Sequence, residues 1–339
     1  MAGKRILYHA VHEILEYDDL RILNDAGFTV FSMGSYGNPA ARGNRFRGHH
    51  ASFVNPEDFA AAVAGGTTFV DGRLRVTREF VARFDAVIVN QNPLMVLDNL
   101  EAFGDRPVIY RTLGQSIFAW EEMLKPVADR LSVVRYSEHE VHPDFLPTRA
   151  VIPFGKYVDE YPLWVGGGDI LTFMNTAARP AARPEQGAYQ ELVADVSAKL
   201  YGLDNEGIAN AAGLVTPEKQ MDLYSRARCY VYIHSLVASY TLNFMEAMLV
   251  GAPILAPSRA LVSSQPYPDW WPERYAIESM LADGAGLIYG SIAEGREILA
   301  NLERYDLQGV SRVARARARD LFDAQRVIAQ WRDFIDSLI

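Results

Sequence analysis

The feature that most constrains the fold is an alternation of short, continuous apolar runs with helix-forming segments. The run KRILYH at residues 4–9 precedes DDLRILNDA at 18–26, the stop Gly27 and a second run, FTVFS, at 28–32. A strand, a helix and a strand at this spacing form a βαβ unit, whose two strands are parallel. The alternation therefore predicts an α/β protein built on parallel sheets.

Four more runs continue the series, as expected for parallel strands that are buried on both faces. They are AVIVN at 86–90, PVIY at 107–110, VVRYS at 133–137 and AVIP at 150–153. The stretch FGKYVDEYPLWVGGGD at 154–169 then brings a proline and three consecutive glycines, a composition typical of a linker or hinge. We therefore expect a first Rossmann-like domain over residues 1–160.

A second α/β series follows the linker. Its expected strands lie at 170–174, 229–234 and 253–256, and its expected helices at 190–200, 216–227 and 241–249. Thr216 at the cap position, Pro217 at the first helical position and Glu218 just inside form a well-defined helix start. We expect this second domain over 161–322.

The last segment, 313–339, has a helical pattern, and a C-terminal helix at 323–339 is expected to cross back to the first domain. Two doubly wound domains of this kind are expected to face each other across a cleft at the carboxyl ends of their strands, where ligands of such folds bind.

Composition narrows the class of protein. The 339 residues are 49% hydrophobic and 22% charged, with a net charge of −9, which argues against a general affinity for nucleic acid. Cys229, the single cysteine, lies in an apolar run and is expected to be a small buried hydrophobe. No secretory leader and no apolar run of about 18 residues is visible, so we expect a cytoplasmic protein, with contact at a membrane surface left open.

One carboxylate stands in an apolar setting. The stretch SLVASYTLNFMEAMLVGAP at 235–253 places Glu246 about one turn into a helix that follows a strand and a short polar loop. The free N–H groups of such a helix start favour an anion such as a diphosphate. A carboxylate there can accept two hydrogen bonds from the vicinal hydroxyls of a ribose. A local cap or ion pair is the alternative interpretation.

The stretches LVTPEKQMDLYSRARCYVYIHS and MEAMLVGAPILAPS resemble the nucleotide-binding domain of GT-B glycosyltransferases, in particular their large retaining family 4. The resemblance is specific over about 214–258 and weaker elsewhere. It implies the GT-B fold and the transfer of a sugar from a UDP- or GDP-linked donor to a hydroxyl, with no metal and no cofactor. It also implies that Glu246 holds the ribose. The sequence departs from the family at Ala238, where an acid that contacts the sugar is usual.

Other donor-binding residues are expected around the same helix and at the end of the strand ILTFM. The arginines of TAARPAAR suit bidentate contact with a diphosphate, although solvated loop arginines would look the same. The candidates are Ser235, Ser239, Tyr240 and Thr241 before the helix, and Asn175, Arg179 and Arg183 after the strand.

The first domain offers candidates for acid–base chemistry. If the reaction inverts configuration, His9, Glu13 and Asp18 are candidate general bases. If it retains configuration, an oxygen of the donor phosphate takes the proton. His9 and His12 form a His-x-x-His pair, but two further ligands are not evident, so we expect no metal site. Asp18 and Asp19 are also expected to cap their helix.

The sequence gives fewer indications of the residues that bind the acceptor. The segment YRTLGQS supplies Arg111, Gly114 and Gln115, which either contact the transferred sugar or form a plain turn. The loop ARGNRFRGHH at 41–50 carries Arg42, Arg45 and Arg47 in an acidic protein. It predicts an anionic acceptor, either a phosphorylated lipid or sugar or a hydroxymethylated base in DNA, unless it is simply a solvated loop.

Other classes of protein are also compatible with this sequence. Ala238 prompts the alternative of a degenerate nucleotide-sugar-binding module without transfer activity. An epimerase or a phosphorylase on the same scaffold is a further alternative. The sequence does not indicate an oligomeric state.

Overall fold

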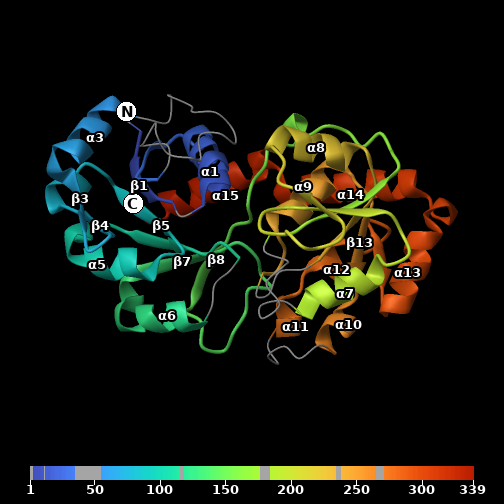
Figure 1. Cartoon of the computed structure of the whole chain (residues 1–339). Helices are drawn as coiled ribbons and strands as arrows, with labels where there is room; N and C mark the ends of the chain where they lie inside the picture. The colour runs from blue at the N-terminus through green and yellow to red at the C-terminus, as the bar shows by residue number, and fades with distance from the viewer. Residues whose placement is uncertain are drawn as a thin grey trace. The chain divides into compact units, whose positions relative to one another are not determined.

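A computed structural model of the chain describes residues 3–10, 12–34, 55–114, 118–175, 184–233, 238–264 and 271–339. The chain divides into two compact units (Figure 1). Unit 1 comprises Met1–Lys156 with Ala324–Ile339, and unit 2 comprises Tyr157–Asp323. Each unit is built on its own six-stranded sheet.

Unit 1 alternates strands and helices along the chain. Its elements are β1 (Arg5–His9), α1 (Glu13–Asp25), β2 (Thr29–Ser32), α3 (Pro56–Ala61), the π-helical turn η3 (Ala62–Gly66), β3 (Thr67–Val70), β4 (Arg73–Val76), α4 (Arg78–Val81), β5 (Ala86–Asn90), α5 (Pro93–Phe103), β6 (Val108–Arg111), α6 (Phe118–Leu124), the 3₁₀ turn η4 (Lys125–Arg130), β7 (Leu131–Arg135), β8 (Thr148–Val151) and α15 (Ala324–Asp336).

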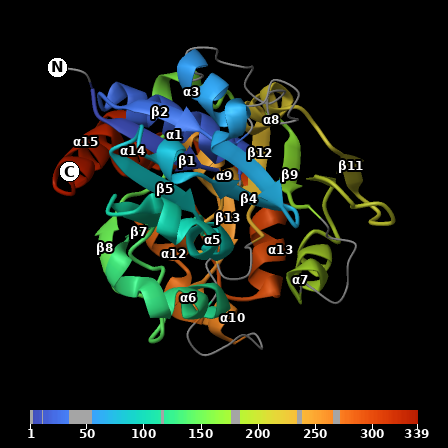
Figure 2. The ribbon, with the colours of Figure 1, turned by 90° about the vertical axis from the view of Figure 1, so that its left-hand side faces the viewer.

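The main sheet of unit 1 is parallel throughout, with the strand order β2-β1-β5-β6-β7-β8. Its continuous apolar strands are buried on both faces, as the sequence predicts. On one face the strands pack against α4 and α5 through Phe80, Val96 and Phe103. Helices α1 and α15 lie side by side in both ribbon views (Figures 1 and 2). β3 and β4 form a separate antiparallel hairpin.

Unit 2 repeats the plan. Its elements are the 3₁₀ turn η5 (Val158–Glu160), β9 (Asp169–Phe173), α7 (Pro184–Leu192), β10 (Ala198–Tyr201), β11 (Ala211–Gly213), α8 (Pro217–Ser225), β12 (Ala227–Val231), α9 (Leu242–Val250), β13 (Ile254–Pro257), α10 (Arg259–Ser263), α11 (Trp271–Arg274), α12 (Ile277–Met280), β14 (Leu287–Tyr289), α13 (Ile292–Ala300), the 3₁₀ turn η7 (Leu302–Arg304) and α14 (Leu307–Phe322).

The sheet of unit 2 is also parallel, in the order β11-β10-β9-β12-β13-β14. One core joins α7 and α13 to the strands and includes Cys229. Cys229 is fully buried and burial raises the pKa of its thiol to about 12, which confirms its interpretation as an inert hydrophobe. Helix α9 packs against both α8 and α14.

Several local predictions are confirmed by the cap geometry. The Thr216 hydroxyl accepts a hydrogen bond from the N–H of Lys219 at 3.3 Å, and Pro217 opens α8. Helix α9 ends at Gly251, whose φ of 83° is left-handed. A Cβ on Gly251 would lie 2.7 Å from Ser311 Oγ on α14, so packing as well as conformation requires glycine there.

Two expectations are wrong. Residues 190–200 are not one helix, because α7 ends at Leu192 and β10 begins at Ala198, a strand buried beside β9. The expected helical segment 313–339 is confirmed, and it divides into α14 and α15 at Asp323. The backbone of Asp323 is extended, with φ −58° and ψ 127°, and the N–H of Ala324 then bonds to the carbonyl of Lys156 at 2.9 Å.

The second error concerns Asp18 and Asp19, which do not cap α1. The helix begins earlier, and the cap is His12, whose Nδ1 accepts from the N–H of Leu15. Both aspartates lie in the middle of the helix and are buried. Asp18 forms an ion pair with Lys156, and Asp19 forms one with Arg111. Within the described ranges, every helix is too short or too polar to span a bilayer.

The ion pair between Asp18 and Lys156 generates a prediction about stability. Both side chains are almost fully buried. Asp18→Ala would leave the Lys156 ammonium buried without its counter-charge, and we expect a loss of about 3–5 kcal/mol in the free energy of unfolding. Denaturant unfolding measures this loss.

The matched control is Asp336→Ala, which removes the partner of Lys4 in an ion pair at the surface. Exposed pairs contribute at most about 1 kcal/mol. Equal losses in the two variants would contradict the account of the buried pair.

Candidate functional site

The strand order of unit 2 reverses between β9 and β12, and α9 begins beside this point. β9 has β10 on one side and β12 on the other, so the connections that follow β9 and β12 diverge. In open α/β sheets ligands bind outside the carboxyl ends of the strands at such a reversal. Asn243, in the first turn of α9, donates from Nδ2 to the carbonyl of Phe173, the last residue of β9, at 3.5 Å. Helix α9 is thereby attached to the end of β9.

Thr241 caps the start of α9. Its hydroxyl accepts from the N–H of Phe244 at 3.3 Å. Ser239 and Tyr240 precede it, and both side chains are buried. The ring of Tyr240 packs against Phe322 of α14 at a centroid distance of 5.4 Å. The donor contacts expected of these three residues stay predictions.

Glu246 lies in the second turn of α9 and is 6% exposed. Its Oε2 accepts a hydrogen bond from Nε2 of Gln220 on α8 at 3.2 Å. The same amide nitrogen is 3.0 Å from Oδ1 of Asn243. Gln220 therefore fixes the orientation of the carboxylate relative to the first turn of the helix. Gln220 was not predicted from the sequence, because nothing in the spacing of α8 marks a residue that faces α9.

An aromatic cluster lies beside this carboxylate. It consists of Phe173, Tyr201, Tyr224 and Tyr230, with the rings of Phe173 and Tyr201 stacked at 5.3 Å and those of Tyr224 and Tyr230 edge to face at 5.3 Å. Burial, together with the charge of Glu246, raises the pKa of the Tyr224 and Tyr230 hydroxyls above their ordinary value. The hydroxyls of Tyr224 and Tyr230 therefore stay neutral beside Glu246 near pH 7.

Asn175 follows β9, and its side chain holds the segment that follows β10. Its Oδ1 accepts from the N–H of Leu203 at 2.9 Å. Gly202, with φ 138°, passes so close that a Cβ would lie 2.1 Å from the carbonyl of Met174. The Asn175 oxygen is thus engaged within the protein, while the side chain is exposed. The other donor candidates of this region, Ser235, Arg179 and Arg183, lie outside the described residues.

In unit 1 the corresponding reversal lies between β1 and β5, and His9 is the last residue of β1. The imidazole is 8% exposed, and burial lowers its pKa from 6.5 to about 4. It is therefore neutral near pH 7 and able to accept a proton. Glu13 is the first residue of α1, and its side chain is outside the description. Asp18 forms a buried ion pair with Lys156, and its proposed role as a general base stays a prediction.

Arg111 is also placed differently from the prediction. Its side chain is fully buried and its guanidinium pairs with Asp19. It lies over the rings of Phe154 and Trp331 at 5.3 and 5.0 Å. Tyr8 donates to the same carboxylate of Asp19 at 2.5 Å. Arg111 therefore ties β6 to α1 and α15, and its fully buried position is that of a structural residue. The alternative, that it contacts a sugar, stays a prediction.

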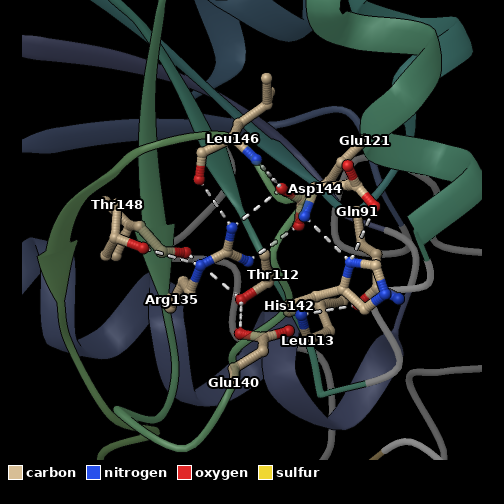
Figure 3. A network of polar contacts seen from close by, with 11 residues as sticks. Gln91, Thr112, Leu113, Glu121, Arg135, Glu140, His142, Asp144, Leu146 and Thr148 are labelled. Atoms are coloured by element: carbon tan, nitrogen blue, oxygen red, sulfur yellow. Dashed lines mark hydrogen bonds and ion pairs between the residues drawn. The ribbon is translucent and has the colours of Figure 1, made fainter. Parts of the chain in front are cut away.

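The turn that follows Arg111 is held by a network of polar contacts (Figure 3). The Thr112 hydroxyl donates to the Glu140 carboxylate, and the N–H of Leu113 donates to Oε1 of Gln91 at 2.6 Å. Gln91 follows β5 and has a positive φ of 39°, which is uncommon for a residue with a side chain. Strain of this kind persists only where the surroundings fix the conformation.

The base of the network is an ion pair between Arg135 of β7 and Glu121 of α6 (Figure 3). It is bidentate, with both nitrogen–oxygen distances 2.8 Å, and both side chains are buried. The N–H of Leu146 also donates to Glu121 at 2.8 Å. The pair thus fixes the loop after β7, which carries Glu140, and through Glu140 it fixes the turn at Thr112.

Gly114 closes this turn with a left-handed φ of 86°. A Cβ at Gly114 would lie 3.0 Å from the ring of Tyr136. Gly114 is buried, and both its left-handed conformation and the closeness of Tyr136 favour glycine there. Gln115, Arg42, Arg45 and Arg47 lie outside the described residues. In the part of the chain that is described, no group of three or more His, Cys, Asp or Glu is placed to hold a metal ion.

The low pKa of His9 predicts a pH dependence of stability. The unfolded chain binds the proton near pH 6.5 and the folded chain near pH 4, so the unfolded state gains protons first as the pH falls. Stability present above pH 6.5 is therefore lost between pH 6.5 and 4, by about 3 kcal/mol. His9→Gln should flatten the denaturant-unfolding profile over this window. A profile as steep as that of the unchanged protein would contradict the assignment.

The turn at Gly114 gives a second prediction. Gly114→Ala imposes a left-handed alanine, which costs about 1–2 kcal/mol, and a contact with Tyr136, which adds about 1–3 kcal/mol. Gly27→Ala is the matched control, because Gly27 also has a positive φ, of 97°, but a Cβ there meets nothing within 4 Å. Thermal or denaturant unfolding should show the larger loss in Gly114→Ala, and a larger loss in the control would be inconsistent with this packing.

Comparison with known proteins supports the architecture. No protein-family model matches the chain, and no curated protein sequence matches it significantly. HepE of Anabaena, solved in complex with UDP-glucose, matches with a TM-score of 0.63 and 14% identity, over 98% of this chain and 100% of that one. A glycosyltransferase from Rickettsia africae ESF-5 matches with a TM-score of 0.63 and 9% identity, over 100% and 99%.

AviGT4, a glycosyltransferase involved in avilamycin A biosynthesis, matches with a TM-score of 0.55 and 14% identity, over 97% of this chain and 96% of that one. At these identities the structural similarity supports the fold alone. The narrower resemblance to family 4 stays a prediction. With its two units, each on a parallel six-stranded sheet, the chain has the GT-B fold that the sequence predicted.

Proposed function

We propose that the chain is a glycosyltransferase that moves a sugar from a UDP- or GDP-linked donor to a hydroxyl acceptor. The observation that carries the proposal is the position of Glu246 in the second turn of α9, beside the strand reversal of unit 2. Support comes from the fold shared over almost the whole chain with HepE, which was solved with UDP-glucose.

The geometry of α9 suits each part of a nucleotide diphosphate. The N–H groups of its first turn and its dipole favour the negative diphosphate. The Glu246 carboxylate has two oxygens, and Gln220 donates to one of them at 3.2 Å. The remaining lone pairs can accept from the two ribose hydroxyls. Arg179 and Arg183 are proposed to neutralise the leaving diphosphate without a metal.

In the transfer the bond between the anomeric carbon and the diphosphate oxygen breaks, and the acceptor oxygen bonds to that carbon. The acceptor proton has two destinations. With retention of configuration, which the family resemblance favours, it passes to an oxygen of the departing phosphate. With inversion it passes to a general base, for which we propose His9, whose lowered pKa of about 4 leaves it neutral near pH 7. Glu13 is the second candidate.

We further propose an anionic acceptor. Arg42, Arg45 and Arg47 concentrate positive charge in a protein with a net charge of −9. A phosphorylated lipid or sugar fits this charge, and a cytoplasmic protein that works at the membrane surface would meet such lipids. Gly114 and Gln115 are proposed to lie near the transferred sugar. Hydroxymethylated DNA is the second acceptor, and retention on a DNA column that is lost when the three arginines are neutralised would favour it.

The donor site is tested by thermal unfolding with UDP-glucose, UDP-N-acetylglucosamine, GDP-mannose and GDP. A ligand at about 100 times its Kd stabilises the folded state by about 2.7 kcal/mol, which raises Tm by several degrees in a protein of this size. Glu246→Ala removes the acceptor for two hydrogen bonds to a charged group, so we expect an affinity at least about tenfold weaker.

Glu297→Ala is the matched control, because Glu297 is an exposed acid on α13 of the same unit. It should leave the shift unchanged. A Tm shift that survives in Glu246→Ala would rule out the proposed role of the carboxylate. Binding without turnover of the donor on any acceptor would instead indicate the non-catalytic module suggested by Ala238.

A further inference from the structure

A glutamine of α8 makes three close polar contacts beside the proposed ribose site. Helix α8 packs against α9 (Figure 1), and Gln220 lies near its start, partly buried. The amide nitrogen Nε2 of Gln220 lies 3.2 Å from the hydroxyl of Tyr224, 3.0 Å from Oδ1 of Asn243 and 3.2 Å from Oε2 of Glu246. All three neighbours are oxygens, so Gln220 turns its donor side toward α9.

The neighbours of Gln220 fix which way its amide points. The Tyr224 hydroxyl uses its hydrogen on the carbonyl of Asn243, at 3.0 Å, so toward Gln220 it is an acceptor. The Nδ2 of Asn243 donates to the carbonyl of Phe173 at 3.5 Å, which turns its Oδ1 toward Gln220. A carboxylate is an acceptor alone. A reversed amide would set its own oxygen against these oxygens, which excludes the opposite orientation.

The carboxylate of Glu246 is therefore held in one orientation. The last side-chain torsion of a glutamate is ordinarily broad, so an unrestrained carboxylate turns readily. The hydrogen bond from Gln220 keeps Oε2 toward α8. Glu246 is 6% exposed, so little water is at hand to replace a hydrogen bond that a ligand fails to make. Gln220 thus preorganises the acceptor positions that a ligand at α9 meets.

We propose that Gln220 is a positioning residue that makes the donor site select a ribose over a 2′-deoxyribose. The inference rests on the proposed function, in which the two ribose hydroxyls donate to Glu246. A carboxylate held in one orientation meets both hydroxyls of a ribose. A 2′-deoxyribose leaves a buried oxygen without the hydrogen bond that it is oriented to accept. Without Gln220 the carboxylate turns to the donors that are present, and the penalty on the deoxy ligand falls.

Isothermal titration calorimetry with matched nucleotides tests the proposal. The probes are UDP and 2′-deoxy-UDP, with GDP and 2′-deoxy-GDP as the second pair. The unchanged protein should bind the ribose form of its own pair at least about tenfold more tightly, the effect of one hydrogen bond to a charged group. Gln220→Met keeps the length of the side chain and removes the donor, so the ratio should fall to about threefold or less. Equal binding of both forms by the unchanged protein, or a ratio that Gln220→Met leaves intact, would overturn the proposal.

A purely structural role of Gln220 has a different signature. It would lower the Tm of the free protein and weaken both members of a pair alike, and the ratio of their affinities would not move. Glu218→Gln is the matched control, because Glu218 is an exposed residue of the same helix. This control should leave the ratio at the value of the unchanged protein.

A double variant separates this inference from the proposed function. Because Gln220 acts through Glu246, adding Gln220→Met to Glu246→Ala should weaken binding of the ribose form by less than about twofold more. Fully additive losses would show that Gln220 acts on its own, and they would overturn the positioning role alone. Nucleotide binding that is absent from the unchanged protein, or that survives Glu246→Ala, would instead overturn the proposed function and this inference with it.

Discussion

The direction of the strands is the constraint on which the rest of this structure depends. Each sheet is parallel and reverses its order once, between β1 and β5 in unit 1 and between β9 and β12 in unit 2. At a reversal the connections diverge, and the carboxyl ends of two neighbouring strands are left uncovered. His9 stands at the first of these points, and the helix that carries Glu246 begins at the second. The candidate chemistry thus follows from topology before any particular side chain is considered.

Buried charge is the second organising element. In unit 1 three ion pairs, Asp18 with Lys156, Asp19 with Arg111 and Glu121 with Arg135, join helices to strand ends and loops. Such pairs add little net stability compared with apolar residues, but leaving one partner alone is costly. Their effect is to permit one arrangement of the loops beyond β6 and β7. The strained Gln91 and the left-handed Gly114 lie within this arrangement, as Figure 3 shows for Gln91.

The sequence predicted the fold class, most strands and the cap of α8, because those depend on local patterns of apolar, capping and turn residues. It misjudged residues 190–200, where apolar residues three and four positions apart fit an amphipathic helix but the end of the segment pairs with β9. It also placed Asp18 and Asp19 at a helix cap, since nothing in a single sequence shows that Lys156 and Arg111 lie within reach of them. Gln220 was missed for the same reason, because its role depends on the packing of α8 on α9.

The central claim is that Glu246 holds the ribose of a nucleotide sugar. A crystal structure with UDP or UDP-glucose soaked in tests it most directly. The account predicts both ribose hydroxyls within about 3.2 Å of the Glu246 carboxylate oxygens, with the diphosphate at the first turn of α9. A nucleotide bound elsewhere, or bound at α9 with its ribose turned away from Glu246 and Gln220, would contradict it.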